Sequence, residues 1–425
     1  MILNRQLLSL FLLIFSSMFV FSQTKKTDIN ENKINSVKLD SSLYVPAEFD
    51  NTLDYLLQSW VVKQANLPNC LSSKDVASVT DSIYKLRLSR MPCLMEMPYN
   101  TTVRSYIDLY TTKKRRQVEY LMGMSNYYFP LFEQELSANN LPLELKYLPI
   151  IESALNTSIV SRMGAAGLWQ LMIKTGKMYG LEINSLVDER LSPAKATHAA
   201  IRFLKDLYSI YGDWNLVIAS YNCGPGNISK AMRRSGGKHD YWAIYPYLPR
   251  ETRGYVPVFI AANYSMHYAS EHNLCAATVN MPALTDTVMV RRRIHLEQIS
   301  WVLNLPIEEI RLLNAQYRKD IIPGDIKPYA LCLPLDQANL FIQKLDEIAA
   351  YRADELINNR RSQIEVQQAT ADSGAAGKVV HYKVKSGDTL SSIAARNGVS
   401  VKKLKQWNHI SGNKVKKGQV LKIIK

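Results

Sequence analysis

The sequence predicts a mainly α-helical protein that ends in two small β-α-α-β modules. Between Lys113 and Glu271, apolar residues recur at helical spacing, and no convincing alternating strand pattern interrupts them. After Asp286 the sequence repeats without a gap when Val288 is aligned with Tyr382, and each copy reads strand, helix, helix, strand. We therefore expect one helical domain followed by two copies of a small module.

Length and composition are typical of a globular protein with two or three domains. The chain has 425 residues, of which 47% are hydrophobic and 21% charged. Its net charge of +15 is concentrated near the end, since residues 378–425 contain twelve Lys or Arg and one acidic residue, Asp388. In an exported protein such a basic segment favours anionic polymers of the cell envelope, so we expect no nucleic-acid partner.

The first 22 residues have the features of a signal peptide. Arg5 supplies the positive charge, Leu7 to Phe21 form the apolar core, and Ser22 closes a small-residue exit. The apolar run is too short for a confident membrane span, and no other stretch is long and apolar enough. No cysteine precedes Cys70, so no lipid-acceptor cysteine lies near the cleavage site. We expect an exported protein without a transmembrane span after cleavage, located in the periplasm or associated with the cell wall or outer membrane.

The five cysteines do not define a disulfide pattern. An exported protein permits disulfides, and Cys70 and Cys93 are the nearest pair, but unpaired cysteines are an equally good interpretation. No cluster of Cys and His has the spacing of metal ligands, so the sequence predicts no metal and no cofactor.

Capping residues define helix ends in the helical region. Asn100 or Thr101 could cap the helix that contains Val103. The helix that contains Val118 to Leu136 should end near Asn139. These signals predict the start of one helix and the end of the next.

The segment from Leu145 to Leu155 places a carboxylate inside an apolar stripe. At about 3.6 residues per turn, Leu145, Leu148, Glu152 and Leu155 fall on one face of a helix. Desolvation disfavours a charged carboxylate, so the pKa of Glu152 should be raised toward that of a usable general acid. An ordinary surface glutamate is the alternative interpretation when the segment is considered alone.

Two prolines flank this acid. Pro142 should start the helix of Glu152, because proline is tolerated in the first turn. Pro149 would then lie inside the helix, where it should kink it or leave a carbonyl group free.

A glycine-rich turn, Ser161 to Met172, leads into Trp169 and Gln170. Glycine lets the backbone approach a ligand closely, and a tryptophan face can stack on a sugar ring. The glutamine can hydrogen-bond hydroxyl or acetamido groups. A purely structural turn and a tryptophan in the core are the alternatives.

Three other segments downstream of Glu152 carry polar groups. One ends a helix with two polar side chains before a sharp turn, one contains a carboxylate and a tyrosine, and one is a short charged stretch. They are Ser220 to Gly226 with Tyr221 and Asn222, Leu248 to Pro257 with Glu251 and Tyr255, and Asp188-Glu189-Arg190.

Together these motifs resemble the lytic transglycosylase family, which has a lysozyme-like catalytic domain. The resemblance covers roughly residues 99–271, and it is specific because several spaced motifs occur in the right order. Cys223 and Ser220 replace residues that are commonly alanine in the family, and we expect both small-for-small changes to be silent. The matching motifs are Glu152-Ser153, Gly167-Leu168-Trp169-Gln170, Tyr221-Asn222-Cys223-Gly224-Pro225-Gly226 and Glu251-Thr252-Arg253-Gly254-Tyr255-Val256.

The resemblance implies a peptidoglycan lytic transglycosylase of cell-wall turnover and remodelling. Glu152 would protonate the glycosidic oxygen between N-acetylmuramic acid and N-acetylglucosamine, and then accept the C6 hydroxyl proton as a 1,6-anhydro ring closes. The substrate's acetamido group can stabilise the cationic centre, so neither a water nucleophile nor a second carboxylate is required. The resemblance assigns substrate binding to Ser161, Gly167, Trp169, Gln170, Met172, Tyr221, Asn222, Glu251 and Tyr255, with Glu251 also a candidate for holding Tyr221 or Glu152 in place.

Two alternative functions stay open at this point. In a continuous helix Glu144 would lie about 12 Å from Glu152, beyond the roughly 5–9.5 Å of hydrolytic carboxylate pairs. A lysozyme-type hydrolase could still draw its second carboxylate from elsewhere, and a catalytically inactive peptidoglycan-binding protein is the other alternative. The remaining candidates for a hydrolytic partner are Asp188, Glu189, Asp213 and Glu251.

The C-terminal copy of the repeat, Val380 to Lys425, resembles a LysM peptidoglycan-binding domain. Its first strand is residues 382–385, Asp388 should cap a helix from Thr389, Ser400 should cap the next, and residues 420–424 form the returning strand. A shallow groove between two loops would hold glycan that contains N-acetylglucosamine. The residues that the resemblance assigns to this groove are Gly387, Asp388, Thr389, Leu390, Asn408 and Ile410.

The first copy keeps the apolar frame of that module but changes its binding loop. Arg293-Ile294-His295 stands where the second copy has Gly387-Asp388-Thr389. We interpret this copy as a degenerate LysM-like module, for which glycan binding and a purely structural role are both open. Between the copies, Gln337 to Ile364 has the pattern of an amphipathic helix, and residues 367–377 form a linker.

The expected domain organisation follows the chain in order. It is a signal peptide (1–22), a polar linker with N-terminal helices of no assigned role (23–98), the lysozyme-like transglycosylase domain (99–275), the degenerate LysM-like module (286–335), a helix and linker (336–378) and the LysM domain (379–425).

Overall fold

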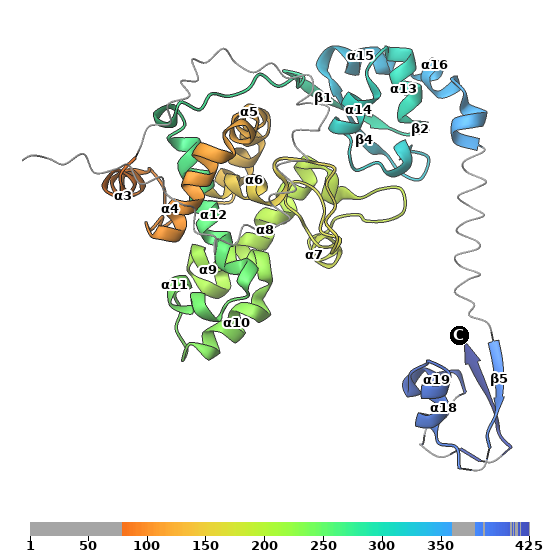
Figure 1. The fold of residues 1–425 in the computed structure, drawn as a ribbon. Coiled ribbons are helices and arrows are strands. Elements are labelled where there is room, and N and C mark those ends of the chain that lie inside the picture. The colour runs from red at the N-terminus through yellow and green to blue at the C-terminus, as the bar shows by residue number, and fades with distance from the viewer. Residues whose placement is uncertain are drawn as a thin grey trace, which may run out of the picture. The chain divides into compact units, whose positions relative to one another are not determined.

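The computed structural model describes residues 79–358 and 379–424, without residues 386, 409, 411, 413, 414 and 417. The predicted signal peptide, the polar linker before residue 79 and the linker at 367–377 lie outside the described residues. The fold is mainly α, with small β-α-α-β modules near the C-terminus, as the sequence predicts (Figure 1). Within the described part of the chain, no helix is long and apolar enough to cross a membrane.

The first helical region runs from α3 to η5 and contains only isolated β-bridges between its helices. Two of its helices, α4 and α9, begin at capping side chains: the Asn100 side chain accepts the N–H of Val103, and Asp213 accepts that of Leu216. The elements are α3 (Asp81–Arg90), α4 (Thr101–Asp108), the π-helix η1 (Leu109–Lys113), α5 (Arg115–Ala138), η2 (Leu143–Tyr147), α6 (Leu148–Ser153), α7 (Ile173–Met178), η3 (Glu189–Leu191), α8 (Pro193–Tyr211), α9 (Trp214–Cys223), α10 (Pro225–Arg234), α11 (Tyr241–Ile244), η4 (Tyr245–Tyr247), α12 (Arg250–His267) and η5 (Ser270–His272).

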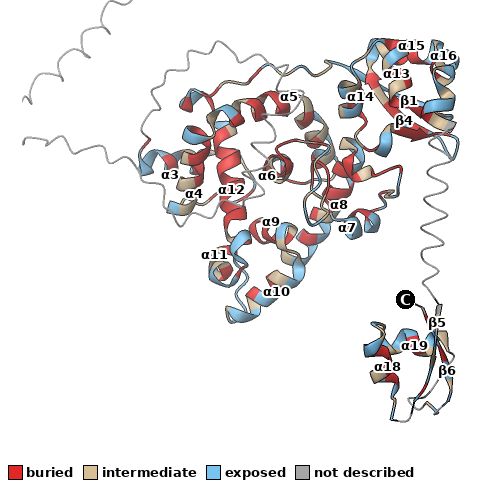
Figure 2. Cartoon of the chain, turned by 45° about the vertical axis from the view of Figure 1, so that its right-hand side comes forward, coloured by how far each residue is buried: buried red, intermediate tan, exposed pale blue. Residues whose placement is uncertain are grey.

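Helix α12 is the centre of this region. Figure 2 shows it buried along most of its length, and Phe259 and Tyr264 are fully buried. It packs against α4, α9 and α6. A helix buried on nearly all sides is typical of the middle of a large α-helical core, so α12 provides a rigid support for side chains at its N-terminal end.

The segment before Tyr99, to which the sequence assigned no role, is part of the same core from Val79 onward. Tyr84 and Leu88 of α3 are buried, and the Tyr84 ring lies 5.5 Å from that of Tyr264 on α12. The Arg87 guanidinium donates to the Tyr264 hydroxyl at 3.0 Å. Residues 79–98 therefore belong structurally with the helices that follow them.

The helix of Glu152 is shorter than predicted. Residues 143–147 form the 3-10 helix η2, and α6 begins only at Leu148, which places Pro149 in its first turn. The predictions that Pro142 starts the helix and that Pro149 kinks it are therefore wrong. Because proline lacks an N–H and clashes with the preceding turn, a new helix begins there instead of one continuing through it. The left-handed Ala154 then ends α6.

The LysM-like module is built around two antiparallel strand pairs and its own core. Strand β1 (Thr285–Val290) pairs with β4 (Tyr329–Pro334), with Thr285 opposite Pro334 and Val290 opposite Tyr329. An added pair, β2 (Arg293–His295) and β3 (Ile321–Pro323), lies inside this frame in sequence. The module's helices are α13 (Leu296–Leu303), α14 (Ile307–Leu313), α15 (Leu335–Gln343) and α16 (Leu345–Ala350), followed by the π-helix η7 (Asp354–Asn358).

The amphipathic helix predicted from Gln337 to Ile364 is wrong over its described part. It is divided into α15, α16 and η7, because Lys344 leaves helical geometry and Arg352 has a left-handed φ of 46°. The apolar residues of the predicted pattern still face the core on both sides of the break at Lys344, since Phe341 and Ile348 are both buried.

The C-terminal module has the predicted β-α-α-β order. Strand β5 (Val379–Lys383) pairs with β6 (Val420–Ile424), and α18 (Leu390–Arg396) and α19 (Val401–Trp407) lie between them in sequence. Ser400 caps α19 as predicted, whereas α18 is capped by Thr389 rather than by Asp388. The Asp388 carboxylate instead accepts from the Lys385 N–H and the Tyr382 hydroxyl, both at 2.8 Å.

Three cysteines in the described part of the chain, Cys93, Cys223 and Cys332, are free thiols, and Cys275 is disulfide-bonded. The pairing of Cys70 with Cys93 that the sequence suggested is therefore wrong. The Cys93 thiol lies 3.4 Å from both the Met91 and Met95 carbonyl oxygens, so it is held locally within its own loop.

Candidate active site

Glu152 lies at the edge of an apolar cluster. Leu145, Leu148 and Leu155 are fully buried, and Glu152 itself is half-buried. The three leucines are buried as predicted, but they do not share one helix face with Glu152, since Leu145 belongs to η2 and Leu155 lies beyond the end of α6. A half-buried acid next to apolar side chains is suited to proton transfer with a bound substrate.

Tyr255, from the first half of α12, holds this acid. Its hydroxyl donates a hydrogen bond to Oε1 of Glu152. Burial, together with the nearby charge of Glu152, raises the pKa of Tyr255 well above its ordinary value. The phenol therefore stays protonated and can serve as a permanent donor to the carboxylate.

Tyr221, at the end of α9, belongs to the same group of side chains. Burial raises its pKa well above the ordinary value, and the charge of Glu152 adds to this effect. Its hydroxyl donates to the Trp169 carbonyl oxygen at 2.6 Å. Tyr221 therefore links the surroundings of Glu152 to the glycine-rich turn.

The glycine-rich turn is fixed by its own hydrogen bonds. The Ser161 hydroxyl oxygen accepts the Ala165 N–H at 3.1 Å, and the Gln170 amide donates to the Gly167 carbonyl at 2.9 Å. Gly167 has a φ of 78°, and a Cβ there would lie 1.9 Å from the Arg190 carbonyl oxygen. Only glycine fits this position, because the backbone packs closely against Arg190; contact of Gly167 with substrate stays a prediction.

Arg190 stabilises this turn by hydrogen bonds to its backbone. Its guanidinium donates to the Gly164 carbonyl at 2.6 Å and to the Leu171 carbonyl at 2.9 Å. The same group forms a buried ion pair with Asp188 at 2.8 Å. Burial alone would raise the pKa of Asp188, but its hydrogen bonds to Arg190 and Arg318 bring the pKa below the ordinary value.

Asn222 is exposed and follows Tyr221 at the end of α9. Its side-chain oxygen accepts a hydrogen bond from the Thr252 hydroxyl at 3.0 Å. The hydrogen bond uses the side-chain oxygen of Asn222 and not its amide nitrogen. Met172 is also exposed, at 43%, just before α7.

Two predicted roles are wrong. Trp169 cannot offer a stacking face to a sugar, because its side chain is fully buried, lies edge-on against Phe132 and donates from its indole N–H to Thr197 at 2.9 Å. The second wrong role is that of Glu251 in holding Glu152, since Glu251 is exposed and it is Tyr255 that donates to Glu152. The contact of Glu251 with substrate stays a prediction. The contribution of Trp169 is its backbone carbonyl, which anchors Tyr221.

Two residues lie in segments that the sequence singled out, but their roles were not predicted. Thr252 precedes Tyr255 by three residues and so lies on the same face of α12, which was a usable signal. The role of Arg190 could not be predicted, because residue type does not distinguish a buried arginine that binds carbonyl groups from an exposed one.

Most of the carboxylates considered as hydrolytic partners have structural tasks. Each is engaged in a local cap, a turn or a buried ion pair. Glu144 accepts the N–H groups of Leu94 and Met95, Asp213 caps α9, Glu189 accepts the Glu182 N–H at 2.7 Å, and Asp188 pairs with Arg190.

Several residues predicted to bind glycan in the C-terminal module also stabilise the module itself. The Leu390 side chain is in the core, with 2% of its surface exposed, so it packs inside the module, and its predicted place beside the glycan stays a prediction. Thr389 caps α18, and Asn408 bonds to both the N–H and the carbonyl of Lys422. Gly387 has a φ of 85°, which allows the turn before the helix.

Asp388 and Ile410 complete the predicted set. The Asp388 carboxylate forms an ion pair with Arg396 at 2.7 Å and supports the loop through Tyr382. Ile410 is half-buried against the module's core. Both side chains therefore shape the loops on either side of the predicted groove.

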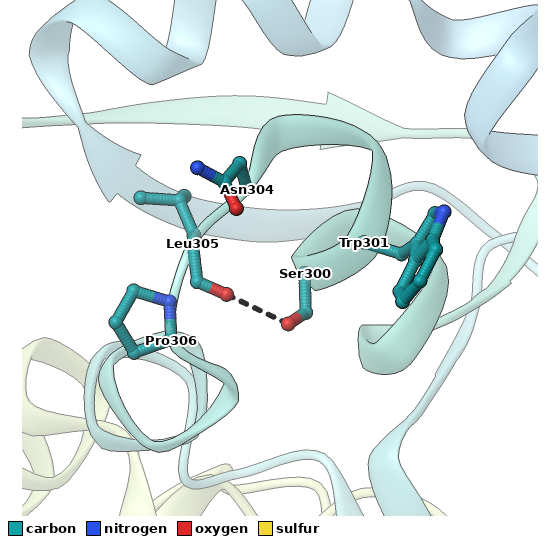
Figure 3. A pocket seen from close by; sticks show the side chains of 5 residues that line it. All are labelled: Ser300, Trp301, Asn304, Leu305 and Pro306. Carbon is teal, nitrogen blue, oxygen red and sulfur yellow. Dashed lines mark hydrogen bonds between the residues drawn. The ribbon is translucent and has the colours of Figure 1, made fainter.

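No metal site accompanies these residues in the described ranges, where no three His, Cys, Asp or Glu side chains are grouped to hold an ion. A shallow hollow of about 430 Å³ lies in the LysM-like module (Figure 3). Its lining contains none of the predicted site residues. The lining residues are Ser300, Trp301, Asn304, Leu305 and Pro306.

Three known families match separate parts of the chain. Residues 129–244 match the transglycosylase SLT domain. Residues 284–350 match the LysM-like domain of lytic transglycosylase MltD, and residues 382–423 match the LysM domain.

Individual relatives carry related names. The chain is 30% identical over 335 residues to membrane-bound lytic murein transglycosylase D of Escherichia coli (strain K12), covering 77% of this chain and 70% of that protein. It is 31% identical over 162 residues to the soluble lytic murein transglycosylase of the same strain, covering 36% and 25%. The crystal structure of the 70 kDa soluble lytic transglycosylase from Escherichia coli aligns with 41% of this chain and 32% of that chain, at 23% identity and a TM-score of 0.31.

The SLT match and the helical fold place the protein among the lytic transglycosylases with a lysozyme-like catalytic domain, the class that the motifs around Glu152 predicted. Within that class, the chain belongs to the family of membrane-bound lytic murein transglycosylase D.

Proposed function

We propose that this protein is an exported peptidoglycan lytic transglycosylase of the bacterial cell envelope, with Glu152 as its single acid and base. It would cleave the β-1,4 bond between N-acetylmuramic acid and N-acetylglucosamine in cell-wall turnover and remodelling. The observation that carries the proposal is the half-buried Glu152 carboxylate held by the Tyr255 hydroxyl.

The reaction needs only one carboxyl group to move protons. The protonated Glu152 gives its proton to the glycosidic oxygen as the bond between that oxygen and C1 of the muramic acid breaks. The resulting carboxylate takes the proton of the C6 hydroxyl, whose oxygen bonds to C1 and closes the 1,6-anhydro ring. The acid is thereby restored, and no water enters the product.

The neighbouring groups support each half of this cycle. Tyr255 donates to Glu152 and so stabilises the carboxylate that forms after the first proton transfer. The turn that carries Ser161 and Gln170 would bind the sugar rings, and Asn222 would bind an acetamido group. Since four of the other candidate carboxylates are engaged elsewhere, the arrangement favours this route over a hydrolytic pair.

Glu152→Gln tests the proposal directly, because it preserves size and removes the transferable proton. Release of 1,6-anhydro muropeptides from purified sacculi should fall to background, while binding to sacculi persists. Glu308→Gln makes the same chemical change at an exposed position of the LysM-like module and should leave the release rate unchanged. If the Glu152→Gln variant released 1,6-anhydro muropeptides at the wild-type rate, Glu152 would have no part in the mechanism.

A further inference from the structure

The two copies of the repeat use the same asparagine to hold the returning strand. The Asn314 side chain donates to the Ile310 and Cys332 carbonyls at 3.0 and 2.7 Å, and accepts the Cys332 N–H at 2.8 Å. Asn408 makes the equivalent three bonds in the C-terminal module, at 2.8, 2.8 and 2.6 Å. The loop after Asn314 therefore corresponds to the loop after Asn408, which is one side of the predicted glycan groove.

In the first copy this loop is bonded to the transglycosylase domain. The Asp188 N–H donates to the Gln316 carbonyl at 2.9 Å, and the Arg318 N–H donates to the Leu186 carbonyl at 2.7 Å. Between them, Val187 and Tyr317 form an antiparallel β-bridge. Main-chain pairing of this kind aligns two segments in one register.

Side chains extend the contact on both sides of that bridge. Leu186 and Val187 belong to the hydrophobic core of the LysM-like module. Glu182 pairs with Lys327 at 2.7 Å and accepts from the Tyr329 hydroxyl at 2.7 Å. The contact thus combines backbone hydrogen bonds, apolar burial and ion pairs.

A line of charged groups leads from this contact to the glycine-rich turn. Arg318 pairs with the fully buried Asp188 at 2.7 Å, and Asp188 pairs in turn with Arg190. Arg190 then donates to the carbonyls of Gly164 and Leu171. A buried carboxylate that loses one of its two cationic partners must reorganise, because the remaining charge is less well compensated.

We infer that the LysM-like module serves as a positioning element of the transglycosylase domain, and that the loop which would border a glycan groove instead binds residues 182–190 of the same chain. Arg318 is the positioning residue, acting through Asp188 and Arg190 on the turn from Ser161 to Met172. The inference rests on the proposed function, since that turn is where the substrate would bind.

The test uses the full-length chain with Arg318→Ala and, as a conservative variant, Arg318→Lys. Arg318→Ala should lower kcat on soluble glycan fragments by about 10- to 100-fold, the cost of slightly misplaced binding groups. Amide hydrogen exchange in the peptide from 161 to 172 should accelerate, and sacculus pull-down should persist. Arg318→Lys should show smaller changes in both kcat and hydrogen exchange than Arg318→Ala, because lysine keeps the charge but not the planar fork.

Arg292→Ala is the matched control, because it removes an exposed ion pair with Asp346 in the same module. It should change neither turnover nor hydrogen exchange. If Arg318→Ala proves unstable, Lys327→Ala weakens the same contact at its exposed edge and should accelerate exchange at 182–190. Unchanged exchange at both 161–172 and 182–190 would overturn the inference, whatever the activity, whereas failure of the proposed function would appear as inactivity of the wild-type protein.

A second observation concerns the hollow in the LysM-like module (Figure 3). Trp301, on α13, is 69% exposed, and its ring stacks on that of Tyr351 at 5.4 Å. In the close-up, Trp301 and Pro306 lie on opposite sides of the hollow, with Ser300 between them. Asn304 ends α13 in a left-handed conformation with a φ of 52°.

These groups have the chemistry of a sugar site. An exposed indole supported by a second ring offers an apolar face with little conformational freedom to lose. A carboxamide beside it can bond to the acetamido group of a sugar. The hollow is formed by residues 300–306, whereas the contact with the transglycosylase domain uses residues 316–329.

We propose that this hollow binds an N-acetylhexosamine unit of the glycan strand, with the ring on Trp301 and the acetamido group on Asn304. This proposal also rests on the proposed function, because it takes the glycan as the ligand. The module would then guide the strand by a surface other than the one that corresponds to the predicted groove of the C-terminal module.

Fluorine NMR of the full chain labelled with 5-fluorotryptophan can test this site, since the sequence has six tryptophans. Trp301→Phe identifies the Trp301 signal, and chitotetraose is the probe. The Trp301 signal should shift with saturation, and Asn304→Gly, which keeps the left-handed backbone, should weaken binding by about tenfold. A Trp301 signal that stays still while that of Trp407 in the C-terminal module moves would refute this site alone. If neither signal moves, the site at Trp301 is refuted as well.

Discussion

At the scale of single residues, the central feature is a carboxylate that accepts a hydrogen bond from a phenol on a helix distant in sequence. Glu152 and Tyr255 are 103 positions apart, and one hydrogen bond fixes the carboxylate relative to α12. Because burial and the charge of Glu152 raise the pKa of Tyr255 well above its ordinary value, this donor is retained throughout the neutral pH range. Tyr255 therefore positions the acid and stabilises its charged form.

Tyr255→Phe should lower kcat about 10- to 100-fold with little change in the free energy of unfolding, because only the hydroxyl is removed. Steady-state kinetics on soluble glycan fragments would measure this. Tyr120→Phe, at an equally buried tyrosine of α5, should leave kcat unaltered. Equal kcat for Tyr255→Phe and the wild-type protein would contradict the role of this hydroxyl.

His272 gives the fold a measurable pH dependence. Burial, with the charges of Arg87 and Arg115, lowers its pKa from 6.5 to about 4, while Glu271 acts in the opposite direction. The ring lies 3.1 Å from the Tyr264 hydroxyl. Above pH 6.5 the residue is neutral in both states and has no effect. Below it the unfolded chain takes up a proton that the folded chain refuses, so the free energy of unfolding should fall from pH 6.5 to about 4.

Urea unfolding across this range should therefore show a flatter pH dependence for His272→Gln than for the wild-type protein. Stability measured near pH 8 supplies the reference for each variant. Parallel curves for the two proteins would show that His272 is not responsible.

At the scale of elements, the glycine-rich turn shows what the sequence could and could not predict. Its glycines and its turn were readable from the sequence, whereas the burial of Trp169 was not, because an aromatic residue suits a core and a sugar site equally well. Caps such as Asn100 and Ser400 predicted helix starts correctly, since they act locally. The division of the helix after Gln337 depended on tertiary packing that periodicity does not report.

Gly167→Ala should destabilise the turn severely, because its Cβ would lie 1.9 Å from the Arg190 carbonyl oxygen and its φ is 78°. We expect a loss of about 3 kcal/mol or more in the free energy of unfolding, measured by urea denaturation. At Gly226, where an added Cβ meets nothing within 4 Å, alanine should be neutral or slightly stabilising. Similar stabilities for the two variants would contradict the close packing of turn and arginine.

At the scale of the whole molecule, positive charge is concentrated in the C-terminal module, which is also the module predicted to bind glycan. The repeat in the sequence predicted both modules, but the contact between residues 182–190 and the first module was not predictable. That contact joins segments more than a hundred residues apart through backbone atoms, which every residue type possesses. The sequence could thus predict both modules and single out Glu152 as the candidate acid, but not the contact between the first module and residues 182–190.

Removing residues 377–425 should weaken pull-down on insoluble peptidoglycan more than it lowers turnover of soluble fragments. For the full-length chain, raising the salt concentration from about 0.1 M to about 0.5 M should also weaken the pull-down, because screening reduces the attraction of the basic module. Sedimentation with purified sacculi measures both effects. Equal retention of the truncated and full-length chains would contradict the binding role of the C-terminal module.

The central claim, that one acid closes an anhydro ring without water, is tested most directly by the mass of the products. Mass spectrometry of sacculi digested by the wild-type protein should find muropeptide ends lighter by one water than those of a hydrolase. Ends of the full hydrated mass, lost on Glu152→Gln, would instead identify a hydrolase and contradict the mechanism.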